Sequence, residues 1–287
     1  MRRRVFLVPT MLALGFAFLY VPILTLVVFS FNNSRLVTVW DAAHSPTLKW
    51  YLELFQNQQI IDAALLSIRV AVINACGAVV LGTLAGLVLA RFGRFRGRTL
   101  LSIMTTAPLV MPEIITGLSM LLLFVALQQA AEALFGTSFN RGVTTLTIAH
   151  ITFSISYVTV VVQSRFAHFD DAIEEAALDL GARPAKVFWR ITLPLIMPAI
   201  VSGWLLAFTL SWDDVVISQF VAGPGSSTLP MVIFSKVRLG VSPDVNALAT
   251  LMVLVVAMGV VGSAQWLQRQ EKRRQREIQL AAANNSA

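Results

Sequence analysis

Six stretches of this chain are each long and apolar enough to cross a lipid bilayer as a helix. A helix needs about 20 mainly apolar residues to span a hydrocarbon core about 30 Å thick, and only 13% of the 287 residues are charged. The stretches lack the strict alternation of apolar and polar residues that marks the strands of a membrane β-barrel. We therefore expect an all-α, polytopic membrane protein with about six transmembrane helices. The stretches are Val5–Phe31, Leu65–Ala90, Leu100–Leu127, Val143–Val162, Ile191–Ala222 and Asn246–Leu267.

The positive charges gather at the N-terminus and in every second connection. Sixteen of the 22 lysines and arginines fall in four groups that would share one side of the membrane. Cytoplasmic segments of membrane proteins carry such an excess of Lys and Arg, so both termini are predicted to be cytoplasmic. The net charge of +7 then reports orientation and contact with lipid head groups rather than nucleic acid. The four groups lie within Arg2–Arg4, Arg91–Arg98, Arg165–Arg190 and Arg269–Arg276.

No polar stretch is long enough to form a separate soluble domain. Residues 1–287 are therefore interpreted as one transmembrane domain with a basic cytoplasmic tail at about 269–287. The first apolar run, about 27 residues, is too long for the core of a secretory signal, and we interpret it as a retained span. The single cysteine, Cys76, can form no internal disulfide. The three histidines share no ligand spacing, so no metal is expected: His44, His150 and His168.

A short polar segment between the fourth and fifth apolar stretches has the features of an exposed helix. Asp171 and Glu174 have capping-box spacing at its start. Gly181 suits the left-handed position that ends a helix, and Pro184 prevents its continuation. A new helix is expected near Lys186. One face of the first helix is apolar and mostly small, which suits a groove on a partner: Ile173, Ala176, Ala177 and Leu180. The alternative is a helix resting on lipid, but its acidic residues would be repelled by anionic head groups.

Three acidic residues lie within the apolar stretches, where ionisable groups are costly and usually functional. They are Glu113, Asp213 and Asp214, and no Lys or Arg lies within a helical turn of them. An acid-lined path would suit a cationic substrate, to which Trp212 could add a cation–π contact. Asp214 is the first candidate because it shares a face with Ser211 and Ser218. The alternative for each acid is structural: Asp213 or Asp214 could cap a break in the fifth helix or pair with a distant cation, such as Arg69, Lys236 or Arg238.

The polar segment also resembles a known motif. Its pattern is Glu175-Ala176-Ala177, three residues, Gly181, nine residues, and Ile191-Thr192-Leu193-Pro194. This resembles the cytoplasmic EAA loop of the membrane subunits of bacterial ABC importers. Much of the remaining chain looks like a polyamine importer permease, and the run Leu36–Trp40 favours the putrescine type over spermidine. The similar segments are SFNNSRLVTVW (Ser30–Trp40), RFGRFRGR (Arg91–Arg98), APLVMPEIITGLS (Ala107–Ser119), EEAALDLGA (Glu174–Ala182) and Leu193–Gly225.

The resemblance implies a type I permease that forms half of a translocation path in the bacterial inner membrane. Its expected partners are a second homologous permease, two ATP-binding subunits and a periplasmic substrate-binding protein. ATP and Mg²⁺ would bind to the ATPase subunits, so this chain is expected to bind no cofactor and to be no enzyme. The coupling loop would cover about residues 166–190. The residues expected to contact the ATPase are Glu174, Glu175, Ala176, Ala177, Asp179 and Gly181.

Other functions remain open from the residues alone. The importer could carry another small solute. An ion-coupled secondary carrier would use Asp213 and Asp214 as its ion site, but such carriers usually have paired repeats and broken helices in both halves. An intramembrane enzyme would need a nucleophile–base or metal constellation, and none is recognisable in the sequence. The phosphate-binding motif G-x-x-x-x-G-K-[ST] is also absent, so ATP hydrolysis by that route would need a partner.

Overall fold

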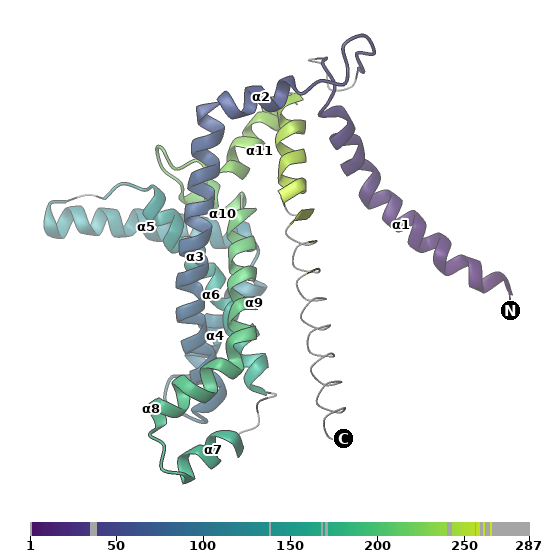
Figure 1. Cartoon of the computed structure of the whole chain (residues 1–287). Helices are drawn as coiled ribbons and strands as arrows, with labels where there is room; N and C mark the ends of the chain where they lie inside the picture. Colours follow the sequence, from purple (N-terminus) through teal and green to yellow (C-terminus); the bar gives the residue numbers. More distant parts are fainter. Residues whose placement is uncertain are drawn as a thin grey trace. The chain divides into compact units, whose positions relative to one another are not determined.

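Helices are the only regular elements in the part of the chain that the computed structural model describes: residues 2–34, 39–137, 139–167, 169, 172–239, 243–255, 257–258, 261 and 265. Asp171, His168, residues 35–38 of the run before Trp40, and the basic tail lie outside these residues. The helices, labelled in Figure 1 except for η1, are α1 (Arg2–Phe29), α2 (Lys49–Gln56), α3 (Gln58–Arg91), α4 (Arg98–Val110), α5 (Glu113–Phe135), α6 (Val143–Ala167), α7 (Ala172–Asp179), α8 (Pro184–Val187), the π-helical turn η1 (Phe188–Thr192), α9 (Leu193–Trp212), α10 (Val216–Val221) and α11 (Leu229–Leu239).

Five helical segments of the described residues are long and apolar enough to cross a membrane: Leu7–Phe29, Gln58–Arg91, Glu113–Phe135, Val143–Ala167 and Pro184–Trp212. A shorter apolar helix, Pro243–Val255, covers the first part of the predicted sixth span. The rest of that span falls largely outside the described residues. The expectation of an all-α membrane protein is confirmed.

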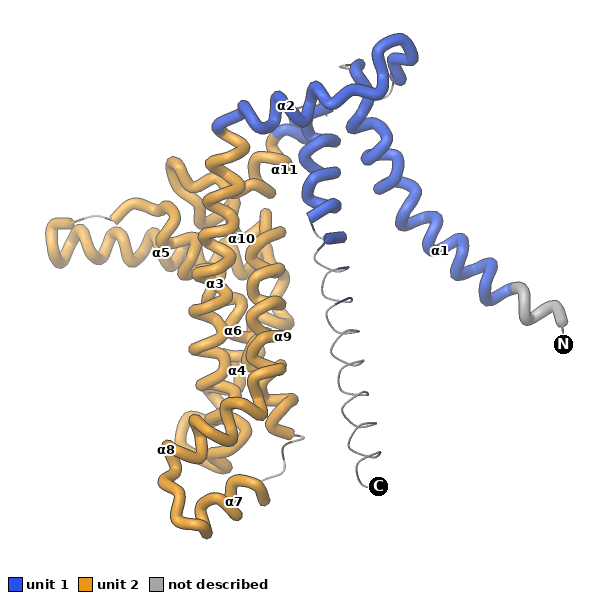
Figure 2. The backbone as a smooth tube through the Cα atoms, viewed as in Figure 1, with its two compact units in different colours: residues 1–58, 236–287 blue, residues 59–235 orange. Residues whose placement is uncertain are grey.

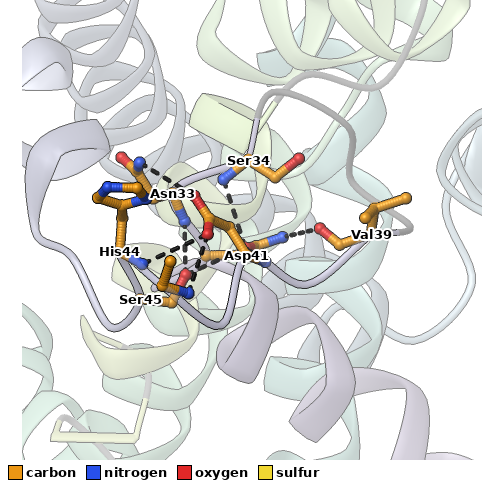
Figure 3. A network of polar contacts seen from close by, with 8 residues as sticks. Asn33, Ser34, Val39, Asp41, His44 and Ser45 are labelled. Carbon is orange, nitrogen blue, oxygen red and sulfur yellow. Dashed lines mark hydrogen bonds and ion pairs between the residues drawn. The ribbon is translucent and has the colours of Figure 1, made fainter.

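The chain divides into two units, coloured separately in Figure 2: residues 1–58 with 236–287, and residues 59–235. The first unit holds α1, whose apolar segment exposes its side chains, and the loop that follows it. Figure 3 shows the polar network of this loop, in which Asp41 accepts hydrogen bonds from the backbone of Ala43 and His44. Buried Asn32 accepts from the Asp41 amide at 2.9 Å, and its carbonyl accepts from the Trp50 indole at 2.7 Å. The loop is therefore built on side-chain hydrogen bonds.

The second unit is a helical bundle whose core is shared by α3, α6, α9 and α10. One apolar cluster includes Val70, Leu146 and Ile217, and another includes Val158 and Ile196. Glycines let α3 approach α6 closely: a methyl group at Gly82 would lie only 2.7 Å from Cβ of Val158. Close approach through small residues is a usual source of packing between membrane helices.

Two predicted spans prove to be broken. The prediction of one continuous span over Leu100–Leu127 is wrong, because the helix stops at Val110 and restarts at Glu113. Pro112 disfavours a helical conformation for the residue before it, and Met111 is extended, with ψ of 136°. The span predicted over Ile191–Ala222 is divided between Trp212 and Val216.

Candidate functional site

The polar segment predicted to be an exposed helix forms α7, at the end of the second unit where α8 also lies (Figure 1). Gly181 has φ of +82°, so its predicted left-handed conformation is confirmed. The Gly181 amide donates to Leu178 O at 2.8 Å, and the Ala182 amide donates to Ala177 O at 3.1 Å. These two bonds form a Schellman motif, which satisfies carbonyls that the helix end leaves open. The next helix, α8, begins at Pro184, two residues before the predicted start.

None of the residues of α7 is buried within this chain. Ile173 and Leu178 on the helix are exposed, and Leu180, which follows it, is 89% exposed. Glu175 and Asp179 are also exposed. Exposed apolar side chains next to charged ones are typical of a surface that a partner covers.

Glu174 differs from its neighbours because it is tied to two other elements of the bundle. One carboxylate oxygen, Oε2, lies 3.3 Å from Nη2 of Arg91 at the end of α3. The other, Oε1, accepts a hydrogen bond from the hydroxyl of Thr192 in η1. The Arg91 guanidinium also lies 4.8 Å from the ring centre of Phe169 and 5.3 Å from that of Phe166. The sequence identified Arg91 only as a member of the basic group Arg91–Arg98; its position directly after the predicted span Leu65–Ala90 was the available signal for this contact.

The break between α9 and α10 contains the two adjacent acids. Asp214 caps α10: its Oδ1 accepts from the Ile217 amide at 3.2 Å, and its Oδ2 accepts from the amide and the hydroxyl of Ser218, each at 2.7 Å. A side-chain oxygen that accepts from an amide two or three residues later is the usual N-terminal helix cap, and the bond from the Ile217 amide has this spacing. Asp214 thus fills the structural role that the sequence left as an alternative.

A histidine on α6 also lies beside Asp214. His150 Nε2 lies 3.3 Å from Asp214 Oδ2 and 3.1 Å from Ser218 Oγ. His150 Nδ1 lies 2.7 Å from Ser211 Oγ, near the end of α9. The side chains of His150 and Asp214 are 2% and 9% exposed. One imidazole therefore bridges both sides of the helix break. Sequence reasoning missed His150 because it considered histidines only as metal ligands.

Ser211, His150 and Asp214 form a row of the residue types found in hydrolytic triads. The sequence analysis had recognised no such nucleophile–base arrangement. Ser211 is only 6% exposed, whereas an enzymatic nucleophile must reach its substrate. Since the imidazole spans the break, we interpret the row as a structural bridge.

Of the other candidate path residues, Asp213 and Trp212 lie at the same break, whereas Glu113 lies on α5. Asp213 is exposed and terminates α9, with its amide donating to Thr209 O at 3.2 Å. Trp212 stacks on Phe208 with 6.1 Å between ring centres. Glu113 is exposed in the first turn of α5, a helix that packs against α10. Of the distant cations considered as partners, Lys236 instead lies 2.5 Å from Asp244.

Comparisons with known proteins agree with this architecture. The family model described as "Binding-protein-dependent transport system inner membrane component" matches residues 78–276. The chain is 55% identical over 272 residues to the putrescine transport system permease protein PotI of Escherichia coli strain K12, covering 94% of each. It is 42% identical over 248 residues to the spermidine/putrescine transport system permease protein PotC of the same strain, covering 86% of this chain and 89% of the relative.

A solved structure supports the fold independently. A bacterial alginate ABC transporter, in complex with an alginate pentasaccharide-bound periplasmic protein, contains a chain that matches with a TM-score of 0.70 at 17% identity. The match covers 91% of this chain and 93% of that one. At so low an identity it shows the fold alone, and it confirms the predicted type I ABC importer permease fold.

Proposed function

The chain belongs to the family of binding-protein-dependent transport system inner membrane components, and we propose that it forms half of the translocation path of an ATP-driven polyamine importer. The relatives at 55% and 42% identity, named for putrescine and for spermidine/putrescine transport, support polyamines as the substrate class. Putrescine is the first candidate because the more similar relative is named for it. The observation that carries the ATP-driven part is α7, an exposed helix closed by Gly181 and tied to the bundle by Glu174.

In this proposal, α7 docks on a separate ATPase subunit that binds ATP and Mg²⁺ and supplies the hydrolytic activity. Ala176, Ala177 and the exposed Ile173 would enter a groove on that subunit, with Glu175 and Asp179 contacting its polar rim. A small-residue helix face in a groove is a recurring mode of recognition. The remaining partners would be a second, homologous permease, a second ATPase subunit and a periplasmic substrate-binding protein.

The proposed substrate path passes the break between α9 and α10. Asp213 is the stronger candidate for contact with a cationic substrate because its side chain is exposed, whereas that of Asp214 is largely enclosed. Glu113 and Trp212 remain candidates on adjacent elements. Asp214 would act on the path by holding the break in shape.

We propose that the protein lies in the bacterial inner membrane with both termini in the cytoplasm. The clustering of Lys and Arg supports this orientation. An impermeant thiol probe on single cysteines provides a test, in a background where Cys76 is replaced by Ser. A cysteine in residues 223–228 should label from outside, and one in residues 92–97 should label only after permeabilisation. The reverse pattern would overturn the orientation.

Uptake into vesicles that hold the complete complex tests the transport function. We expect labelled putrescine and spermidine to accumulate in the vesicles only when ATP is present on the side of the membrane where the ATPase subunits lie. An anionic control such as succinate should not accumulate. Uptake that follows an ion gradient without ATP would refute the ATP-driven importer. ATP-dependent uptake of the anion but of neither polyamine would refute the substrate class alone.

A further inference from the structure

The cytoplasmic ends of four elements meet at one arginine. We propose that Arg91 is a positioning residue that fastens the coupling helix α7 to α3 and, through Glu174 and Thr192, to α9. This inference rests on the proposed function, in which α7 is the element that the ATPase moves. Arg91 would not touch the ATPase or the substrate; it would determine whether a displacement of α7 reaches the membrane-spanning helices.

The contacts around Arg91 form a continuous chain. Its guanidinium is 3.3 Å from Glu174 Oε2, and the other oxygen of the same carboxylate accepts from the Thr192 hydroxyl. Thr192 ends η1 and directly precedes α9. A single carboxylate on α7 therefore contacts α3 through one oxygen and the start of α9 through the other.

The environment of Arg91 suits a fixed geometry. The side chains of Arg91 and Glu174 are only 21% and 20% exposed. The guanidinium lies 4.8 and 5.3 Å from the ring centres of Phe169 and Phe166, so flat aromatic surfaces shield the ion pair from water. Partial shielding strengthens an ion pair relative to one on an open surface. Lysine would not reproduce this arrangement, because it lacks the planar guanidinium that stacks on aromatic rings and binds a carboxylate in a bidentate manner.

Apolar packing holds α7 only weakly. Its eight residues include none that is buried, and a cavity of about 150 Å³ lies between the helix and the bundle. Leu178 lines this cavity from α7, and Leu87, Val187 and Phe188 line it from the other side. With no buried residue in α7, the contacts of Glu174 to Arg91 and Thr192 are polar side-chain contacts that attach this helix to α3 and η1.

The neighbouring segment is suited to movement. η1 is a π-helical turn, and such turns appear frequently at functional sites within α-helices. Beyond it, α9 runs for 20 residues, about 30 Å at 1.5 Å per residue, and ends at the break that contains Asp213. A displacement passed to Thr192 would thus reach the proposed path.

The contacts among Arg91, Glu174 and Thr192, here called the joint, also separate the roles of two adjacent acids. Glu174 faces the bundle, whereas Glu175 is exposed. The structure assigns Glu174 to internal attachment and leaves Glu175 for contact with a partner. Replacing Glu175 should therefore weaken ATPase binding, whereas breaking the Arg91 contact should leave binding intact and lower transport for each ATP hydrolysed.

Hydrogen exchange on the full chain in lipid nanodiscs tests the joint without any partner. In Arg91→Gln, amide exchange in the peptide covering residues 172–182 should quicken about tenfold, which corresponds to about 1.4 kcal/mol. Arg96→Gln, an exposed arginine in the same turn, serves as the matched control and should not change exchange. Equal exchange rates in the wild type, Arg91→Gln and Arg96→Gln would overturn the inference. If Arg91→Gln does not reach the membrane, Arg91→Lys is measured instead; it keeps the charge but loses the planar group, so exchange should still quicken, though less than tenfold, and unchanged exchange would overturn the inference.

The assembled complex provides the second test. We expect Arg91→Gln to co-purify with the ATPase, to continue hydrolysis, and to lower putrescine uptake per ATP hydrolysed by about tenfold, matching the loss of attachment. The exchanged pair Arg91→Glu with Glu174→Arg should recover part of that loss, whereas each single exchange should not. Unchanged uptake per ATP in Arg91→Gln would overturn the inference. Failure of the wild-type chain to bind any ATPase would instead refute the proposed function, and the exchange experiment would still decide whether the joint exists.

Discussion

Asp214→Asn separates a structural aspartate from a transport aspartate. The substitution keeps the size of the side chain but removes its charge and replaces one acceptor oxygen by an NH₂ donor. In the native protein four donors converge on the carboxylate: the Ile217 amide, the amide and hydroxyl of Ser218, and His150 Nε2. Asp213, beside it, is exposed and provides the matched control.

The geometry sets the size of the effect. In the better orientation of the new amide, its oxygen keeps the three donors at the Oδ2 position, and its NH₂ faces the Ile217 amide, which donates at 3.2 Å to Oδ1 in the native protein. An unsatisfied buried donor and the loss of charge-assisted bonds cost about 2 kcal/mol. This corresponds to roughly a 30-fold change in the ratio of folded to unfolded protein. Side-chain hydrogen bonds between membrane helices average nearer 0.6 kcal/mol, which gives a lower limit of roughly threefold.

Two measurements on each variant make the distinction. The amount of folded complex and its melting temperature are followed by size-exclusion chromatography with fluorescence detection, and putrescine uptake is normalised to that amount. We expect Asp214→Asn to lower the yield and the melting temperature while normalised uptake stays near normal. We expect Asp213→Asn to keep a near-normal yield and melting temperature while normalised uptake falls. A normal yield and melting temperature for Asp214→Asn, combined with lost uptake, would refute the structural reading of its contacts.

Three further changes test other parts of the structure. Gly181→Val forces a β-branched residue to φ of +82°, a strain of about 1–2 kcal/mol, so membrane insertion should persist while co-purification with the ATPase falls. Gly223→Ala would place a methyl group 1.9 Å from the Arg141 carbonyl oxygen, so the yield of folded protein should drop severely, whereas Gly142→Ala, with no atom within 4 Å of the added group, should lose far less. Burial acts to raise the pKa of Asp41, but the hydrogen bonds from Ala43, Asn33 and His44 together outweigh it. The pKa of Asp41 therefore lies below its usual value. The contribution of Asp41 to the loop is therefore complete at neutral pH and is lost as the pH falls below about 4; the protection factors of the Ala43 and His44 amides, which correct for the slower intrinsic exchange at low pH, should fall there in the wild type but show no such dependence in Asp41→Asn.

The sequence was sufficient to predict features that depend on local chemistry. A long apolar helix covers all or part of five of the expected spans, because length and hydropathy determine whether a segment can cross a bilayer. The end of α7 followed from Gly181, whose freedom at positive φ is a property of the residue itself. Pro112 carried an equally local signal for the break before α5, but the hydropathy of the surrounding residues concealed it.

Features that depend on tertiary contact could not be predicted in the same way. The bridge from His150 to Asp214 joins residues 64 positions apart, and the bond from Arg91 to Glu174 joins residues 83 positions apart. No periodicity links such partners, since their proximity results from how the helices pack. The sequence did place Ser211, Asp214 and Ser218 on one face, and a search for a buried donor opposite that face would have suggested a histidine.

The contacts along α9 indicate where this helix can and cannot move. Near its start, Arg165 on α6 donates twice to the Leu195 carbonyl, at 3.3 and 3.2 Å. At its end, His150 on the same α6 lies 2.7 Å from Ser211. Two polar contacts to one neighbouring helix, separated by most of the length of α9, oppose sliding between them, so α6 and α9 should move together. Across the break, α10 is also held to α6 by two polar contacts: Ser218 Oγ lies 3.1 Å from His150 Nε2, and Thr145 Oγ1 donates to the Val221 carbonyl at 3.1 Å. We therefore expect spin-label distances from α6 to α9 and from α6 to α10 to stay constant through the transport cycle; a change in either distance would refute the interpretation of His150 as a bridge that keeps the break rigid.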